Sequence, residues 1–292
     1  MIKFAIITVT FNAEKYIQDF LDSLNSQNNK NFKVFFVDNN SVDNTKDIII
    51  KNSNFEYELI SNDENFGVAK GNNIGIKNAQ SENIDWILLA NNDTFFSSDT
   101  LLRLSESIKS NTDYKAFVTK IYDNSRPPKV WYSGGNFSLF KGNTGYHENL
   151  FSVDNEVFNK NKEIKYSPTC FMLINSSVFN EIGLMDEKFF VYYDDTDFCW
   201  RLKKANISIL YLGKIFVFHK IGSSTGGVDS DFTIRYSSRN RVYFLRKSMG
   251  IMPLFIFFPI FLIYYTYRYL IKFRNLNKFM ISIKGLIRGL TL

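Results

Sequence analysis

The first 120 residues alternate short apolar runs with longer segments that are polar along one face. Strands are predicted at 3–10, 32–38, 56–61, 85–90 and 115–119, and helices at 13–27, 43–51, 65–79 and 98–109. The runs 4–7 and 34–37 are apolar on both faces, as is typical of buried parallel strands. This alternation predicts an α/β sheet with right-handed crossovers, in which ligands bind at the carboxyl ends of the strands.

The next segment, 120–165, is rich in glycine and proline and has no sustained helical period, so loops and short strands are expected there. Further elements are predicted after it: a strand at 166–174, a helix from Asn175-Ser176 to Gly183, a helix at 194–205, strands at 207–211 and 215–219, and a helix at 232–248. No internal repeat or low-complexity linker divides the chain. One catalytic domain over 1–249 and a tail over 250–292 are therefore expected.

Charge is distributed unevenly between these two parts. The whole chain has 35 basic and 29 acidic residues, and the tail holds six basic residues and no acid, which leaves 29 of each in 1–249. A neutral body argues against a nucleic-acid-binding protein, whose folded domain should itself carry basic residues. Two cysteines are too few for a disulfide scaffold and favour a reducing cytoplasm.

The tail begins with an apolar stretch, 251–267, that Pro253 and Pro259 interrupt. Its 17 residues are at the lower limit for spanning a bilayer, and tyrosines and basic residues follow it. This pattern favours an interfacial or re-entrant anchor on an anionic membrane surface. The alternative is a pair of helices that packs on the domain or on a second subunit of a homo-oligomer.

Polar clusters end four of the predicted strands or begin the helices that follow, at 8–12, 38–41, 65–75 and 91–94. One such cluster is most simply a helix cap or turn, but four at one sheet edge predict a ligand site. The spacing of Gly67, Gly71 and Gly75 matches neither a dinucleotide fingerprint nor a P-loop. It suits close packing of a helix on the sheet, whereas Asn65 and Gly67 could offer free N–H groups to an anion.

Several acids and one histidine are candidates for chemistry. Asp93 follows an apolar strand, and a single carboxylate among amides suits Mg²⁺ or Mn²⁺ bound together with substrate phosphates. His219 also ends an apolar run and is a second candidate ligand. Of the acids that open the helix at 194, Asp194 suits an N-cap and Asp197 a pair with Arg201. For Asp195 the sequence suggests no comparable structural role, so it is the strongest candidate for a chemical one.

Taken in order, these motifs resemble those of the inverting family 2 glycosyltransferases, in particular the bacterial rhamnosyltransferase-like branch that builds surface polysaccharides. The resemblance covers about 3–247 and rests on VTFN, VDNNS, NFGVAKGNNIG, LLANND and YYDDTDFCWR, followed by His219 and Arg239-Asn240. It implies the GT-A nucleotide-diphospho-sugar fold, a mostly parallel central sheet flanked by helices, here with a C-terminal helical membrane-associating appendage.

The resemblance also implies roles for individual residues. Thr8, Thr10 and Phe11 would line the pocket for the base of the nucleotide-sugar, and Asp38 would accept a hydrogen bond from the ring N–H of uracil or thymine. Asn65 and Gly67 would lie near the base and ribose, and Asn92 would face the ribose. Arg239 would help to neutralise the leaving diphosphate. Asp93 and His219 would hold Mn²⁺ or Mg²⁺. Asp195, beside Asp194, would be the general base that deprotonates the acceptor hydroxyl, with inversion in a single displacement.

The implied reaction moves a sugar such as rhamnose from a UDP- or dTDP-linked donor to a surface-polysaccharide or lipid-linked acceptor, at the cytoplasmic face of the inner or plasma membrane. One departure is Asn91, which replaces the first carboxylate of the usual Asp-x-Asp metal motif. A catalytically inactive sugar- or partner-binding protein at the membrane is therefore the alternative. A nucleotidyltransferase is disfavoured, because 8–12 lacks the basic, glycine-rich loop that a triphosphate requires.

Overall fold

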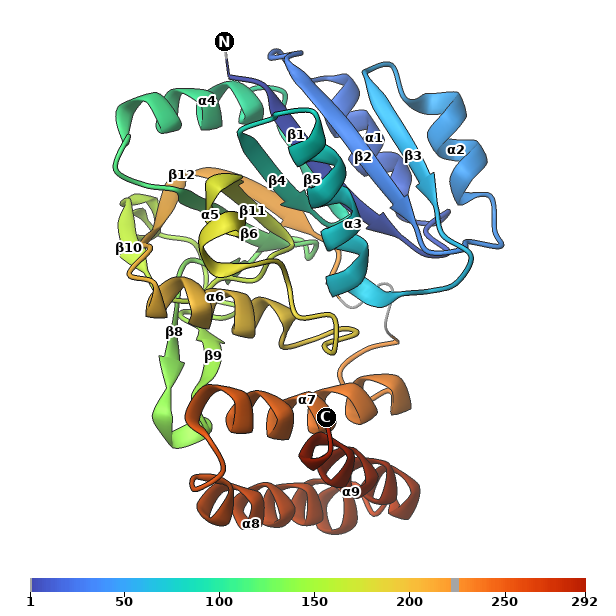
Figure 1. Cartoon of the computed structure of the whole chain (residues 1–292), viewed down its shortest axis with the longest axis vertical. Coiled ribbons are helices and arrows are strands. Elements are labelled where there is room, and N and C mark those ends of the chain that lie inside the picture. Colours follow the sequence, from blue (N-terminus) through green and yellow to red (C-terminus); the bar gives the residue numbers. More distant parts are fainter. Residues whose placement is uncertain (1, 222–225) are drawn as a thin grey trace.

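The computed structural model describes residues 2–221 and 226–292. Within that part of the chain, a sheet of ten strands forms the centre of the molecule (Figure 1). Its strand order is β10-β12-β6-β11-β4-β1-β2-β3, with β5 beside β12 and β7 beside β6. A separate two-stranded hairpin and a group of C-terminal helices lie below this sheet in the view of Figure 1.

The N-terminal half follows the predicted alternation closely. Strands β1 to β4 are mutually parallel in the order β4-β1-β2-β3. Their bounds, with those of the helices between them, are β1 Phe4–Thr10, α1 Ile17–Asn25, β2 Phe32–Asp38, α2 Thr45–Asn52, β3 Tyr57–Ser61, α3 Gly67–Ser81, β4 Trp86–Ala90 and α4 Thr100–Ser110. The polar clusters after β1, β2 and β4 therefore meet at one edge of the sheet.

The second half extends the sheet with strands of both directions. The elements are β5 Thr94–Phe96, β6 Ala116–Asp123, β7 Val130–Tyr132, β8 Gly135–Ser138, β9 Thr144–His147, β10 Lys162–Ile164, β11 Phe171–Asn175, α5 Ser177–Ile182, α6 Asp194–Lys204 and β12 Ile209–His219. Strand β11 is antiparallel to both β4 and β6. The two strands predicted at 207–211 and 215–219 form one strand, β12, because an irregularity between Leu212 and Phe216 accommodates the extra residues without ending the strand.

Helix α3 packs on β1 through its small residues, as their spacing predicts. A Cβ atom added at Gly71 would lie 2.8 Å from Val9 Cγ1, and one added at Gly75 would lie 2.4 Å from Ile7 Cγ2. Both distances are shorter than a side chain tolerates, so only glycine permits this approach. The close packing fixes the start of α3 beside the ends of β1 and β2.

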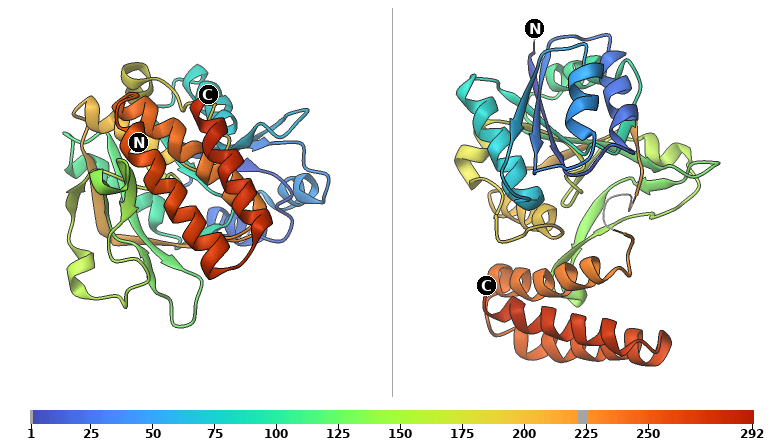
Figure 2. Two further views of the ribbon diagram at one scale, coloured as in Figure 1. Left: turned by 90° about the horizontal axis from the view of Figure 1, so that it is seen from below. Right: turned by 90° about the vertical axis from the view of Figure 1, so that its right-hand side faces the viewer.

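The C-terminal helices form a unit with its own core. Helix α7 spans Asp231–Met249, α8 spans Leu254–Tyr265 and continues in π-helical turns to Lys272, and α9 spans Leu276–Leu290. Figure 2 shows α7 between the α/β domain and the other two helices. The core of this unit is formed by Ile234, Val242, Leu245, Leu254, Phe261, Tyr265, Tyr269 and Leu286.

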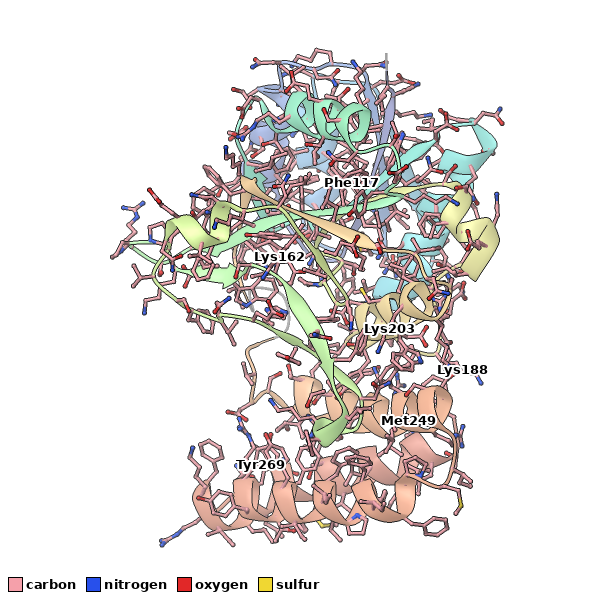
Figure 3. All side chains as sticks on the ribbon, turned by 90° about the vertical axis from the view of Figure 1, so that its left-hand side faces the viewer. Phe117, Lys162, Lys188, Lys203, Met249 and Tyr269 are labelled. Carbon is pink, nitrogen blue, oxygen red and sulfur yellow. The ribbon has the colours of Figure 1, made fainter. Side chains whose placement is uncertain are left out.

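The junction between the two parts is polar as well as apolar. Lys247 of α7 forms ion pairs of 2.7 Å with Asp186 and with Asp197. Asp197 also accepts a 2.8 Å hydrogen bond from Arg201 Nε, which confirms the pair that the sequence predicts. Figure 3 shows Lys188 at the level of this junction, and its carbonyl oxygen accepts a hydrogen bond from Arg239 of α7.

The tail contains one strongly apolar helix. Within the described residues, Leu254–Lys272 is the single helix that is long and apolar enough to cross a membrane, with a mean hydropathy of 1.6. Only 22% of that segment is buried inside the protein. Most of its apolar side chains therefore face outward rather than into the core of the helical unit.

Candidate active site

A pocket opens at the edge of the sheet where the polar clusters meet. It combines aromatic rings with a row of side-chain amides, which suits a ligand with a flat ring and many hydroxyl groups. Its rings are Phe11, Tyr16, Phe190 and Phe232, and its amides are Asn39, Asn65, Asn72, Asn91 and Asn92. Gly67 and Asp93 also line it, so five of the predicted site residues, Phe11, Asn65, Gly67, Asn92 and Asp93, meet here.

Hydrogen bonds among the amides hold the pocket wall in place. Asn92 Nδ2 donates to the carbonyl oxygen of Val9 at 2.6 Å, which ties the end of β4 to β1. Asn39 Nδ2 donates to the carbonyl oxygen of Gly67 at 3.1 Å, which ties the end of β2 to α3. Asn39 belongs to a predicted cluster, although no role of its own could be assigned to it from the sequence.

The start of α3 differs from the expectation of free N–H groups. The Gly67 N–H donates to Asn65 Oδ1 at 2.9 Å, and the Val68 N–H donates to the carbonyl oxygen of Phe190 at 2.7 Å. Gly67 has φ +78°, and a Cβ atom there would lie 2.3 Å from that oxygen. The Asn65 side chain thus occupies one of these donors and the loop before α6 occupies the other, so neither is available to an anion in this conformation.

Three predicted base-binding residues lie behind the pocket rather than in its wall. Thr8, Thr10 and Asp38 are completely buried. The Asp38 carboxylate accepts hydrogen bonds from Thr10 Oγ1 at 2.9 Å and from the backbone N–H of Ser41 at 2.9 Å. In this structure Asp38 therefore braces the loop after β2, and its contact with a base stays a prediction.

Asp93 and His219 lie next to each other, as the metal hypothesis requires. Strand β5 pairs antiparallel with β12 so that Thr94 is opposite His219. This places His219 Nε2 3.1 Å from Asp93 Oδ1, with both side chains almost fully buried. His219 Nδ1 is buried and has no hydrogen-bond partner within the described residues.

This pair fits a divalent cation with two protein ligands. Among the described residues no group of three or more His, Cys, Asp or Glu side chains could hold a metal ion. A cation here would therefore complete its coordination shell with substrate oxygens and water, which is how Mg²⁺ is commonly bound. Asn91 lines the pocket beside Asp93, in place of the missing carboxylate.

The two acids at the start of α6 have different surroundings. Asp195 Oδ2 accepts a 2.8 Å hydrogen bond from the Tyr166 hydroxyl, and Oδ1 accepts one of 2.6 Å from the Thr196 N–H. Burial raises the pKa of Asp195, and these donors oppose the rise. Burial, with the neighbouring charge of Asp195, raises the pKa of Asp194 to about 8. Asp195 is thus the acid that its surroundings help to keep ionised.

A chain of ring contacts that the sequence did not reveal joins the metal candidates to Asp195. The Trp131 ring lies 5.0 Å from His219 and 4.5 Å from His147, and His147 lies 5.8 Å from Tyr166. Burial lowers the pKa of His147 to about 4, so this ring is neutral near pH 7. No sequence motif marks these residues, because they come from the irregular segment 120–165 and its flank.

Cys170, just before β11, senses both acidic sites. Burial raises the pKa of its thiol, and the carboxylates of Asp93 and Asp195 raise it further. The Asp93–His219 pair is linked to Asp195 through the rings of Trp131 and His147 and the hydroxyl of Tyr166.

Arg239, a predicted nucleotide-sugar-binding residue, lies at a separate cavity and not at the pocket. Its Nη2 donates to the carbonyl oxygen of Lys188 at 2.8 Å, and it lines a separate cavity between α7 and α9. Helix α7 directs this side chain toward α9 rather than toward Asp93. Phe190 and Phe232, which the sequence did not single out, occupy that side of the pocket instead.

Comparison with known proteins identifies the family of this chain. The model of the family described as Glycosyl transferase family 2 matches residues 5–183, which is more than half of the chain. A dTDP-rhamnosyl transferase, RfbF of Shigella flexneri, is 26% identical over 83% of this chain and 79% of its own length. The hexosyltransferase Agl10 of low-salt glycan biosynthesis in Haloferax volcanii is 26% identical over 65% of this chain, which spans 60% of that protein.

Two solved structures share the fold at low sequence identity. TarS of Staphylococcus aureus in complex with UDP-GlcNAc superposes with a TM-score of 0.57 at 20% identity, over 85% of this chain and 68% of that one. GalNAc-T7 with UDP, GalNAc and Mn²⁺ superposes with a TM-score of 0.60 at 11% identity, over 86% of this chain and 52% of that one. The expected GT-A fold is confirmed by these likenesses, and with the family match they show that the chain is a member of glycosyl transferase family 2.

Proposed function

We propose that this chain is an inverting glycosyltransferase that moves a hexose such as rhamnose from a UDP- or dTDP-linked donor to a cell-surface or lipid-linked glycan acceptor. The observation that carries the proposal is the Asp93–His219 pair at a pocket lined by rings and amides, with Asp195 linked to His219 through Tyr166, His147 and Trp131. The relatives that transfer rhamnosyl and hexosyl groups, and the solved structures that hold UDP or UDP-GlcNAc, support the donor class.

The pocket suits the nucleoside part of such a donor. Phe11 is 45% exposed, so its ring is available to stack on a base. Asn65 and Asn92 present amide groups that can bind ribose hydroxyls, and both already anchor the backbone around them. Thr8, Thr10 and Asp38 would support this wall from behind and reach the base only if the loop at 39–41 moves.

The chemistry assigned to this site is a single displacement. Asp195 takes the proton of the acceptor hydroxyl as that oxygen attacks the anomeric carbon, and the nucleoside diphosphate leaves from the opposite face. The Tyr166 hydroxyl and the Thr196 N–H orient the Asp195 carboxylate and stabilise its charge before the transfer. Asp194 is largely neutral near pH 7, so it does not compete for the same proton.

Asp93 and His219 would hold a divalent cation, Mn²⁺ or Mg²⁺, which would stabilise the negative charge of the diphosphate. The two side chains are already adjacent, so little rearrangement is needed to bind an ion between them. Asn91 would contribute a neutral oxygen where related metal motifs have a carboxylate. A weaker affinity for the ion is the expected consequence, because a carboxylate attracts a dication more strongly than an amide does.

We also propose that the tail, residues 250–292, attaches the protein to a membrane. The apolar side chains of α8 face outward, and residues 250–292 contain six basic residues and no acidic one. Both features suit the cytoplasmic surface of an anionic membrane. A monotopic attachment there would give the enzyme access to a lipid-linked acceptor. The tail would then be an appendage of a catalytic domain that ends near residue 249, although α7 is shared between the two cores.

The test is release of nucleoside diphosphate from a panel of UDP-, dTDP- and GDP-sugars, with and without Mn²⁺, for the wild type and for Asp195→Ala. We expect metal-dependent release from one donor and a loss of about 10²-fold or more in the variant, which is the usual size of a general-base contribution. A matched control is Asp113→Ala, which removes an exposed acid far from the pocket.

An inactive sugar-binding protein would behave differently in the same assay. It would bind one donor with little difference between the wild type and Asp195→Ala, and neither protein would release nucleoside diphosphate even with lipid-linked acceptors added. That outcome would replace the transferase proposal with the binding one. Donor binding is measured separately by calorimetry, so that absent turnover and absent binding are distinguished.

A further inference from the structure

A second cavity lies outside the donor pocket, between α7 and α9. Its volume is about 220 Å³, and its wall contains Arg235, Tyr236 and Arg239 of α7 and Ile281, Lys284, Gly285 and Arg288 of α9. Four of these seven side chains are cations, and none is an acid. The space is several times the 30 Å³ or so that one liquid water occupies. It can therefore hold a polyatomic anion.

The cations of this cavity lack carboxylate partners. In residues 2–221 and 226–292, no ion pair within 4.0 Å involves Arg235, Arg239, Lys284 or Arg288. Burial lowers the pKa of Arg239, and the nearby charges of Arg288 and Arg235 lower it further. Bringing like charges together is unfavourable unless an anion offsets their repulsion. The arrangement therefore favours a bound phosphate-type group.

Arg239 is held in a fixed position for such a ligand. Its Nε donates to Asn240 Oδ1 and its Nη2 to the Lys188 carbonyl oxygen, each at 2.8 Å. Its guanidinium also lies 4.8 Å from the centre of the Tyr236 ring. A guanidinium ordered in this way loses little further entropy when it binds an oxyanion. The other three cations are long side chains at the cavity rim.

Close contact between the two helices brings the cations together. A Cβ atom added at Gly285 would lie 1.9 Å from Ser238 Oγ, and one added at Gly289 would lie 2.3 Å from the Arg239 carbonyl oxygen. Each helix contributes two cations four residues apart, so each pair lies on one helical face. The glycines let these two faces approach across a narrow gap.

The cavity also adjoins an apolar surface. Helix α9, which forms one wall of the cavity, exposes Leu276, Met280, Ile287 and Leu290, and α8, which packs against α9, exposes Phe255, Ile256, Ile260 and Ile263. Figure 2 shows α8 and α9 side by side at the end of the molecule that is remote from the sheet. Cations beside such a surface are placed as they would be at the headgroup level of a membrane. A free anion in solution would require no apolar surface.

We propose that the cavity lined by Arg235, Arg239, Lys284 and Arg288 binds the phosphate or diphosphate group of an anionic lipid while α8 and α9 contact the membrane. The Tyr236 ring, in the cavity wall, lies 5.0 Å from Phe190 and 4.8 Å from Phe232, two rings of the donor pocket. These rings connect the wall of the cavity to the wall of the donor pocket. If the proposed transferase function holds, a lipid-linked acceptor anchored here would present its sugar beside the donor.

The test compares two variants of the full chain that remove the same number of charges. Lys284→Gln/Arg288→Gln empties one side of the cavity, and Lys272→Gln/Arg274→Gln removes two exposed cations of the same helical unit outside it. Binding is measured to vesicles of phosphatidylcholine with and without phosphatidic acid, at a salt concentration that screens exposed charges. We expect the cavity variant to lose at least about tenfold more affinity for phosphatidic acid vesicles than the control variant.

Equal losses in the two variants would overturn the proposal, because general attraction to a charged surface would then explain the binding. Inorganic pyrophosphate that displaces the vesicles as effectively as soluble short-chain phosphatidic acid would identify a free-anion site instead. The charge-preserving variant Lys284→Arg/Arg288→Lys should bind as the wild type does, which separates a lost site from a misfolded helix. The assay contains no sugar donor, so its result is independent of the transferase proposal.

Discussion

At the scale of single residues, the acids at the start of α6 show how surroundings assign chemistry. Asp194 and Asp195 are adjacent in sequence, yet only Asp195 accepts a hydrogen bond from a tyrosine hydroxyl, that of Tyr166. Burial raises the pKa of the Tyr166 hydroxyl well above its ordinary value, so it stays protonated and remains a donor. The network therefore favours an ionised Asp195 and a protonated Asp194, a division of the kind that acid–base sites use.

Tyr166→Phe should move the acidic limb of the pH–rate profile to higher pH. The lost hydrogen bond favours the charged carboxylate, so its removal raises the pKa of Asp195 and leaves less of the base ionised at low pH. We expect a several-fold loss of kcat/KM at acid pH and little change at alkaline pH. Tyr146→Phe, at an exposed tyrosine of β9, serves as the control. A loss that is uniform across pH would contradict this role.

Asp194→Asn should stabilise the protein at pH 8 and have little effect at pH 4. The folded-state pKa of about 8 lies above the ordinary 3.8, so the folded state binds the extra proton between these values. Wild-type stability should therefore fall as pH rises through this window and level off above it. Asparagine keeps a neutral side chain at all pH values and removes this dependence. Thermal unfolding at several pH values checks the prediction, and parallel curves for both proteins would refute it.

At the scale of elements, the site depends on how closely α3 lies against β1. Gly71 and Gly75 allow the helix to contact Val9 and Ile7 directly, and this contact sets the position of Asn65 and Gly67 at the helix start. The same device recurs at Gly285 and Gly289, where α9 meets α7. In both places a missing side chain determines the distance between two elements, and each pair of elements frames a candidate ligand site.

Gly75→Ala should lower the free energy of unfolding by about 1–3 kcal/mol, the usual effect of overpacking a core. The new Cβ would lie 2.4 Å from Ile7 Cγ2, on a fully buried strand residue that has no room to move. Lys77→Ala, at an exposed position of the same helix, should change stability by no more than about 0.5 kcal/mol. Urea unfolding of both variants decides the point, and equal stabilities would show that α3 can shift freely.

At the scale of the whole molecule, the chain combines an α/β domain with a helical unit that exposes much apolar surface. Ion pairs from Lys247 to Asp186 and Asp197 dock α7 on the domain, so the unit is attached in a defined orientation. The β8–β9 hairpin also reaches this unit, where Gly142 lies against Phe261 of α8. At the tip of the hairpin, Leu139 and Phe140 are exposed beside the apolar helix. This surface suits the proposed membrane contact.

Replacing Phe255, Ile256 and Ile263 with serine should release the protein from membranes. These side chains are 74%, 65% and 68% exposed, so the fold does not need them. Each apolar side chain transferred from water contributes about 1.5–3 kcal/mol, so partitioning into vesicles should weaken by about a hundredfold or more. Ile50→Ser/Leu102→Ser, on exposed faces of α2 and α4, should leave partitioning unchanged. Unchanged sedimentation of the triple variant with vesicles would contradict a membrane role for α8.

The elements of the N-terminal sheet, and the edge at which its polar clusters meet, could be predicted from the sequence. Periodicity and strand-end chemistry are local properties, so Asp93, Asn65 and Asn92 could be assigned to one site from the chain alone. The same reasoning applied to the small residues of α3, whose packing on the sheet is confirmed.

The residues from the irregular second half that join that site could be identified from the three-dimensional packing alone. Trp131, His147 and Tyr166 reach it through long-range packing that no local pattern records. The direction of Arg239 was decided in the same way, because its place depends on the contact of α7 with α9 rather than on its own sequence neighbours. Local sequence fixes which face a side chain shares with its neighbours, whereas the packing of distant elements fixes what that face meets.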